Sequence, residues 1–184
     1  MSPRSTTRSP RSGAASERRV RTGVRLGIDV GRARIGVARS DAHGMLATPV
    51  ETVRRVASGG HDVERIAVLF AEHGAFEAVV GLPLSLSGAR TPSTDDAEAF
   101  ARRLAERGLP VRLVDERLST VSAQSQLHQA GRNTKNSRGV IDQAAAVVIL
   151  QHALDTERAQ SAPPGEALDP QDADPIAEDR GDER

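Results

Sequence analysis

Three carboxylates stand at positions where an uncompensated charge would be costly. Asp29 interrupts an apolar run that begins at Leu26, Glu116 follows the apolar run Val111–Val114, and Asp142 comes directly before an apolar segment. An ionised side chain in such surroundings destabilises a fold unless it is paired or bound to a metal ion. Each acid also has a plainer interpretation: a strand-end turn residue for Asp29, a solvated acid for Glu116, and a helix-dipole partner for Asp142.

Grouped together, three carboxylates would favour a divalent cation. Like charges at close range repel, so one acid would keep its proton unless a cation neutralised the group. Ligand sets made only of oxygen favour Mg²⁺ or Mn²⁺ over zinc. Two such ions about 4 Å apart could activate a water and stabilise the leaving oxygen of a phosphodiester. The chain has no cysteine, and its five histidines show no metal-ligand spacing, so we expect no other cofactor.

The elements that must position these acids can be predicted from hydrophobic periodicity and from turn residues. Three short strands at 26–30, 35–38 and 47–53 are followed by alternating helices and strands. Helices are expected at 63–70, ended by Gly74, from Pro92 to Gly108, from Ser119 or Thr120 to Ala130, and at 140–155; further strands are expected at 78–81 and 111–114. Strands in hairpin order followed by helical crossovers predict an α/β fold with a mixed sheet.

This topology strengthens the case for a joint site. Consecutive parallel strands present their carboxyl ends on one side of a sheet, where α/β proteins place their sites. Asp29 on the first strand, Glu116 after the last strand and Asp142 at the start of the final helix could meet there.

The formal net charge of zero conceals a strong asymmetry between the ends of the chain. Residues 1–23 hold six arginines and one glutamate, and residues 159–184 hold eight acidic residues and two arginines. Both ends are poor in large apolar residues, so the burial of apolar surface cannot offset the entropy cost of ordering them. We therefore predict a disordered basic tail at 1–23, one domain at 24–158, and a disordered acidic tail at 159–184.

Four motifs in the predicted domain resemble the YqgF (RuvX-like) family. They occur in the family's order and span essentially the whole domain, so that together they form a specific signal. The motifs are Gly27-Ile28-Asp29-Val30-Gly31 with Arg34-Ile35-Gly36-Val37-Ala38-Arg39-Ser40-Asp41, Val80-Gly81-Leu82-Pro83 with Gly88, Asp115-Glu116-Arg117-Leu118-Ser119-Thr120, and Ile141-Asp142-Gln143-Ala144-Ala145-Ala146 with Ile149-Leu150-Gln151.

The resemblance implies an RNase H-like three-layer fold, with a mixed five-stranded sheet and helices on both faces. It also implies that Asp29, Glu116 and Asp142 are the catalytic, metal-binding acids of a nuclease. Family members are described as nucleases that process the 5′ end of pre-16S rRNA, and some as Holliday junction resolvases.

A basic segment directly before Asp142 is the candidate for nucleic-acid binding. Arginine and lysine there suit contacts to the phosphate backbone, which fix position but read no sequence; the candidates are Arg117, Arg132, Lys135 and Arg138. The chain lacks Trp and Tyr, which disfavours a base-stacking platform. Recognition by phosphates and shape suits structured pre-rRNA or branched DNA.

Three functions follow as hypotheses. The first is an Mg²⁺- or Mn²⁺-dependent endonuclease acting on pre-16S rRNA, with the pre-30S ribosomal particle as a partner. The second is a Holliday junction resolvase, which needs a dimer to present two sites to one junction. The third is a non-catalytic nucleic-acid-binding module. The sequence leaves a monomer and a homodimer open, and its lack of a long apolar run predicts no membrane partner and a cytoplasmic location.

Overall fold

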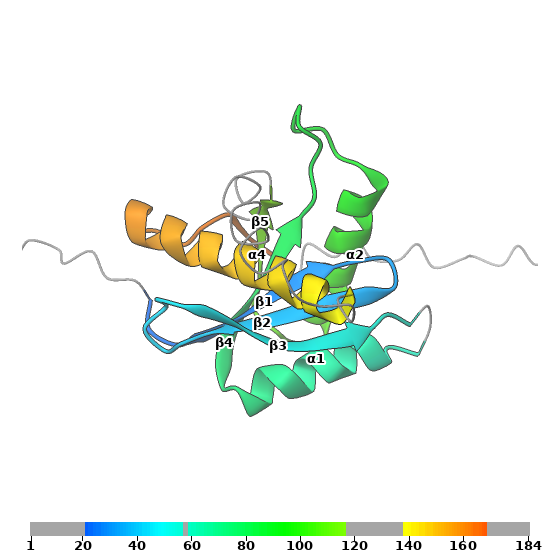
Figure 1. Cartoon of the computed structure of the whole chain (residues 1–184), viewed down its shortest axis with the longest axis horizontal. Coiled ribbons are helices and arrows are strands. Elements are labelled where there is room, and N and C mark those ends of the chain that lie inside the picture. The colour runs from blue at the N-terminus through cyan, green and yellow to red at the C-terminus, as the bar shows by residue number, and fades with distance from the viewer. Residues whose placement is uncertain (1–20, 57–58, 117–137, 169–184) are drawn as a thin grey trace, which may run out of the picture.

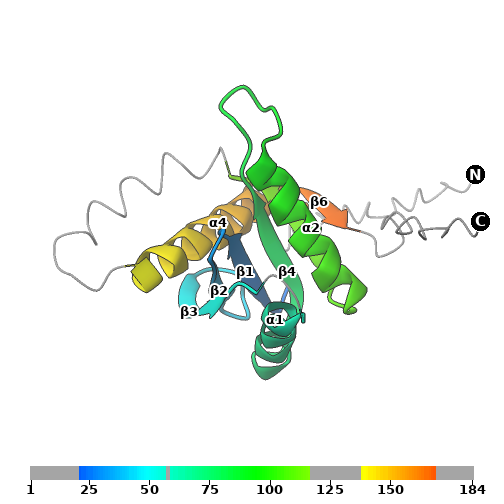
Figure 2. The same ribbon diagram turned by 90° about the vertical axis from the view of Figure 1, so that its right-hand side faces the viewer.

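The protein is built around one mixed sheet with helices on both of its faces. The computed structural model describes residues 21–56, 59–116 and 138–168. Its sheet has the strand order β3-β2-β1-β4-β5-β6. The elements are β1 (Val24–Val30), β2 (Arg34–Ser40), β3 (Ala47–Arg54), α1 (His61–Glu72), β4 (Ala75–Leu82), α2 (Pro92–Glu106), β5 (Val111–Asp115), α4 (Arg138–Gln160) and β6 (Glu166–Leu168). The predicted three-layer α/β architecture is confirmed: α1 and α2 lie on one side of the sheet and α4 on the other (Figures 1 and 2).

The directions of the strands follow from the length of their connections. Short turns join β1 to β2 and β2 to β3, and both pairs are antiparallel. The β4 strand pairs with β1 in parallel, and β5 with β4, because α1 and α2 carry the chain back across the sheet between them. As a result β1, β4 and β5 end at the same edge of the sheet, as predicted for the strands that carry or precede Asp29 and Glu116.

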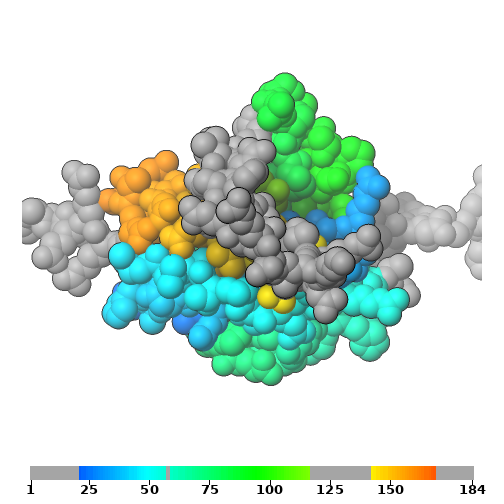
Figure 3. All heavy atoms as spheres, in the orientation of Figure 1, coloured from blue at the N-terminus to red at the C-terminus, as the bar shows by residue number. Residues whose placement is uncertain are grey.

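Each face of the sheet has its own apolar core. Side chains of β1, β2, β4 and β5 pack against α1 and α2 in the larger core, which includes Leu26, Ile28, Ile35, Val37, Val80, Ile66, Phe100 and Leu104. The second core packs α4 on the opposite face and is built from Ala38, Val79, Val114, Ala146, Ile149, Leu150 and Leu154. In the space-filling view, the orange end of α4 lies directly above the cyan strands (Figure 3).

One strand was not predicted, and it lies in the range expected to be a disordered tail. The sheet has six strands instead of five because β6 pairs antiparallel with β5, from Val111↔Leu168 to Leu113↔Glu166. Leu168 also packs against the larger core. Three residues after a Pro-Pro-Gly turn are too short a run to show a strand period, so the sequence pattern gave no sign of β6. The last helix is longer than predicted too, because α4 continues to Gln160.

An ion-pair network fixes the end of α4 that is remote from the acids. Glu157 is only 2% exposed, and its carboxylate accepts hydrogen bonds from Arg25 at 3.0 Å and from Arg21 at 3.1 Å. Arg25 is 1% exposed and lies over the ring of Phe76. Arg21 also pairs with Glu77 at 2.8 Å, although it falls within the range 1–23 predicted to be disordered. The network joins the last turns of α4 to the start of β1, so the helix runs antiparallel to that strand.

The described residues contain no helix that is both long enough and apolar enough to cross a membrane. The helix expected from Ser119 or Thr120 to Ala130 lies outside the described residues.

The buried Glu157 carboxylate is predicted to be a major contributor to stability. Glu157→Ala leaves the Arg25 guanidinium buried without its counter-charge, which should lower the free energy of unfolding by about 3 kcal/mol. Urea denaturation measures the change. Glu106→Ala, at an exposed position on α2, is the matched control and should change stability by less than about 0.5 kcal/mol. Equal small effects of the two substitutions would contradict the anchoring role.

Candidate active site

Asp29 lies in a row of glycines on the face of the sheet that α4 covers. Its antiparallel partner on β2 is Gly36. On the other side, Gly81 of β4 follows directly after Val80, the parallel partner of Ile28. Because neither neighbour carries a side chain, the sheet surface around Asp29 is open on both sides. We call this surface the Gly36–Gly81 floor, and two other groups pack onto it.

The first of these groups is the start of α4. A Cβ atom placed on Gly36 would lie 1.9 Å from the carbonyl oxygen of Asp142, so the helix backbone rests directly on β2. The Nε2 of Gln143 donates a hydrogen bond to Thr52 Oγ1 on β3 at 3.2 Å, which fastens the same turn to the sheet. This close approach brings Asp142 beside Asp29, although 113 positions separate them in the chain.

The second group is the side chain of Glu116, directly after β5. A Cβ on Gly81 would lie 2.2 Å from Glu116 Oε1 and 2.7 Å from Ile149 Cδ1. The carboxylate therefore folds back over β4 toward α4. The structure thus places all three predicted acids at one end of the sheet, with Asp29 on the strand between those that lie under Asp142 and Glu116.

The electrostatics of the three acids follow from this arrangement. Burial, together with the nearby Asp142, raises the pKa of Asp29 to about 6. Burial, together with Asp29 and Asp115, raises the pKa of Glu116 to about 7. Both shifts have the same physical cause, since removal from water and nearby negative charge each disfavour ionisation. A cation at this position would lower both pKa values by supplying the missing counter-charge.

Asp142 has a cationic partner that the sequence pattern did not single out. Arg34, the first residue of β2, donates a hydrogen bond from its Nε to Asp142 Oδ2 at 2.6 Å. Arg34 lies two residues before Gly36, so the alternation of the strand places both on the α4 face. That alternation was readable in the sequence, but the position of α4 above it was not.

The fit of the site to a metal ion can be judged from its donors. They are all carboxylate oxygens, two of them have raised pKa values, and they lie over positions that a Cβ would fill. These features suit a hard divalent cation. Within the described part of the chain, no three histidine or acidic side chains already stand in an arrangement that could hold one ion. The Asp142 carboxylate is turned to Arg34, and its release from that ion pair would be needed for it to join the other two.

The structure describes only one of the four predicted nucleic-acid-binding residues. Arg117, Arg132 and Lys135 lie outside the described residues, and Arg138 is the first residue of α4. Their roles stay predictions.

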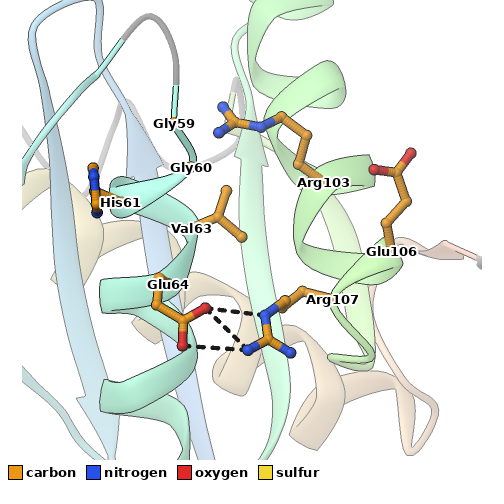
Figure 4. Close-up of a pocket in the computed structure, with 8 residues that line it drawn as sticks. All are labelled: Gly59, Gly60, His61, Val63, Glu64, Arg103, Glu106 and Arg107. Atoms are coloured by element: carbon orange, nitrogen blue, oxygen red, sulfur yellow. Dashed lines mark hydrogen bonds and ion pairs between the residues drawn. The ribbon is translucent and has the colours of Figure 1, made fainter.

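A pocket of about 520 Å³ lies elsewhere, between α1 and α2 (Figure 4). Arg107 and Glu64 form an ion pair across it at 3.0 Å, and Arg103 pairs with Asp62. It belongs to the opposite face of the sheet from the acids, and its charged groups are largely matched. We therefore place the candidate active site over the glycine row instead.

Comparisons with known proteins identify the family of this chain. A family model named RuvX and described as Holliday junction resolvase matches residues 23–156. The chain belongs to the RuvX family.

Its relatives carry a related but different name. A protein of Clavibacter michiganensis subsp. michiganensis named "Putative pre-16S rRNA nuclease" is 60% identical over 85% of this chain and 98% of its own length. A protein of Leifsonia xyli subsp. xyli with the same name is 61% identical over 82% of this chain and 97% of its own. Both names and the family description denote nucleases, so the predicted enzyme class of this RuvX-family chain is confirmed at that level.

A solved structure supports the fold. The structure "T. thermophilus RuvC in complex with Holliday junction substrate" superimposes with a TM-score of 0.50, covering 79% of this chain and 99% of that one at 15% identity. At this identity the likeness bears on the fold alone, and it confirms the RNase H-like architecture predicted for this RuvX-family member.

The close packing of α4 predicts a graded response to alanine at two glycines. Gly36→Ala forces a Cβ against helix backbone, which cannot move without lifting α4, and should lower the free energy of unfolding by about 2 kcal/mol or more. Gly81→Ala meets the ends of two side chains instead, so it should cost less stability while displacing the Glu116 carboxylate. Urea denaturation of both variants tests the order; a costlier Gly81→Ala would contradict it.

The raised pKa of Asp29 predicts a pH-dependent gain from its removal. The folded chain holds the Asp29 proton up to about pH 6, whereas the unfolded chain releases it near its ordinary value, so ionisation destabilises the fold as pH rises between about 4 and 6. Asp29→Asn should therefore be more stable than wild type at pH 8 in the presence of a chelator, by on the order of 2 kcal/mol, and the gain should shrink toward pH 4.5. Urea denaturation at both pH values measures this, and a gain independent of pH would count against it.

Proposed function

We propose that this RuvX-family protein is a metal-dependent endonuclease whose Asp29, Glu116 and Asp142 hold Mg²⁺ or Mn²⁺. The observation that carries the proposal is the convergence of the three carboxylates over the Gly36–Gly81 floor. Two of them are destabilised as anions by burial and mutual repulsion. A fold that keeps unfavourable charges together at one sheet end is characteristic of a functional site.

The residues of the chain would divide the work as follows. Asp29 is fixed by its place within β1 and provides the rigid member of the set. Glu116 and Asp142 approach from the ends of other elements, and their carboxylates complete the oxygen ligands. When bound, the metal would supply an activated water and stabilise the charge that develops on the scissile phosphate. Arg34 pairs with the Asp142 carboxylate, and release of that ion pair would let Asp142 join the other two acids.

For the substrate, we propose the 5′ region of pre-16S rRNA, cut in the cytoplasm during ribosome maturation, with a pre-30S ribosomal particle as the partner. The support is the shared name of relatives at about 60% identity over nearly their whole length. The description of the family model favours a second substrate, a four-way DNA junction. Both substrates have the phosphodiester backbone on which the three acids would act. An experiment must therefore distinguish between them.

Substitution of each acid is predicted to abolish cleavage. Asp29→Asn, Glu116→Gln and Asp142→Asn should each lower the cleavage rate by more than about 100-fold, since loss of even an outer partner of a metal ligand costs 10- to 100-fold. The assay compares a labelled pre-16S leader with a labelled four-way junction, in Mg²⁺, in Mn²⁺ and with a chelator. Asp155→Asn, at an exposed position on the same helix as Asp142, is the matched control and should cleave like wild type.

The outcomes separate the hypotheses. Cleavage of the leader alone supports rRNA processing, and cleavage of the junction alone supports the resolvase function. Cleavage that persists in the chelator, or in all three acid variants, would contradict the metal site. If Asp29→Asn restored normal 16S 5′ ends in cells depleted of the protein, the non-catalytic binding hypothesis would replace the enzymatic one.

A further inference from the structure

Three arginines are placed by the backbone near the corner of the sheet where Asp142 lies, and together we call Arg32, Arg34 and Arg54 the arginine strip. Arg34 opens β2 and is paired in register with Arg54, the last residue of β3. Arg32 lies in the turn between β1 and β2. The backbone N–H of Arg55 donates to the carbonyl of Ala33 at 3.0 Å, which ties the end of β3 to this turn.

Two members of the strip, Arg34 and Arg54, lie on the face that carries the acids. Directly opposed residues of an antiparallel pair project from the same face, with Cβ atoms about 5 Å apart. The next pair on this face is Gly36 with Thr52, which contact Asp142 and Gln143 of α4. Arg34 and Arg54 therefore project toward the side of the sheet occupied by α4, and Arg34 reaches Asp142 itself.

Opposed like charges are an unfavourable choice for a sheet. They destabilise the pair, and sequences normally place opposite charges at such positions. Nearly every other described arginine is compensated: Arg55, the neighbour of Arg54, points to the other face and pairs with Asp62 and Asp96. Arg32 and Arg54 are exposed, and neither side chain has a hydrogen bond or an ion pair in the described structure. Their positive charge is left available to a ligand.

We propose that the arginine strip binds the phosphate backbone of the nucleic-acid strand that is cut, and so directs that strand over Asp142 to Asp29. This inference rests on the proposed nuclease function and adds the track by which the substrate reaches it. A polyanion is the occupant because the strip offers several separate cationic groups along a strand edge, next to the carboxylates that we propose act on a phosphodiester. Arg34 connects the two parts, since it contacts Asp142.

The test measures the salt dependence of binding, without cleavage. Binding of a fluorescent pre-16S leader and of a four-way junction to the full-length chain is followed by anisotropy in the presence of chelator, between 50 and 300 mM salt. Each lost phosphate contact lowers the slope of log K against log salt by about 0.7 for a single strand and 0.9 for a duplex. Arg32→Gln and Arg54→Gln should each weaken binding by about 3- to 10-fold at 100 mM salt, and the double variant should lower the slope by about 1.4 for a single strand and about 1.8 for a duplex.

The chain supplies a matched control. Arg39 is also exposed and unpaired in the described structure and lies on the same strand as Arg34, but near its other end. Arg39→Gln should leave both affinity and slope unchanged. Arg34 is left intact so that Asp142 is not disturbed. Thermal unfolding separates binding from folding: Arg54→Gln removes a like-charge pair, so its melting temperature should equal or exceed that of wild type.

Several results would overturn the proposal. They are an unchanged slope in the double variant, an equal loss in Arg39→Gln, or binding of polyglutamate that is lost in the same variants, which would assign the strip to an acidic protein partner. Failure here is distinguishable from failure of the proposed function. If wild type cuts the substrate while the double variant binds with an unchanged slope, the binding role of the arginine strip is wrong and the nuclease function is supported. If the slope falls as expected while nothing is cut, the strip stands without the nuclease.

Discussion

The close approach of α4 to the sheet is the contact on which the rest of the site depends. A helix covering a sheet normally stands off by the length of the side chains between them. Here Gly27 and Gly36 carry none, and Cβ atoms at these positions would lie 2.9 and 1.9 Å from the carbonyl oxygens of Ala146 and Asp142. The helix backbone therefore rests on β1 and β2. Without this contact Asp142 would belong to a surface helix turn and would have no relation to Asp29.

The helix is held at both ends by different kinds of interaction. At its remote end the buried Glu157 receives Arg21 and Arg25, a charge-charge contact that is strong because it is dry and well hydrogen-bonded. At the active-site end the contact is backbone against backbone, with the Arg34–Asp142 ion pair at its margin. A buried network thus secures one end of the helix, and close packing on Gly36 secures the other. In this way α4 both packs against the sheet and carries the Asp142 carboxylate.

Much of this could be predicted from sequence because the signals are local. The periodic apolar runs gave the described helices and the first five strands, and the rule for parallel strand ends placed Asp29 and Glu116 at one edge. The role of Gly36 and Gly81 could not be read, since a glycine reveals a close approach only when the approaching group is known. Arg34 was overlooked for the same reason, because its partner is 108 positions away. The three-residue β6 strand depends on β5 for its pairing and has no periodicity of its own.

Charge balance gives the most general view of this molecule. Most acidic and basic side chains of the described residues are matched in pairs or networks, even where they are fully buried, as at Arg25 and Glu157. The matching is weakest at one corner, where Asp29 and Glu116 repel each other and where Arg54 stands opposite Arg34 without an acidic partner. Folding alone would favour neutralising both defects, and a single substitution at either would do so. The negative charge of the acids is available to a cation, and the positive charge beside it is available to an anion. A site for a metal-bound phosphodiester requires both.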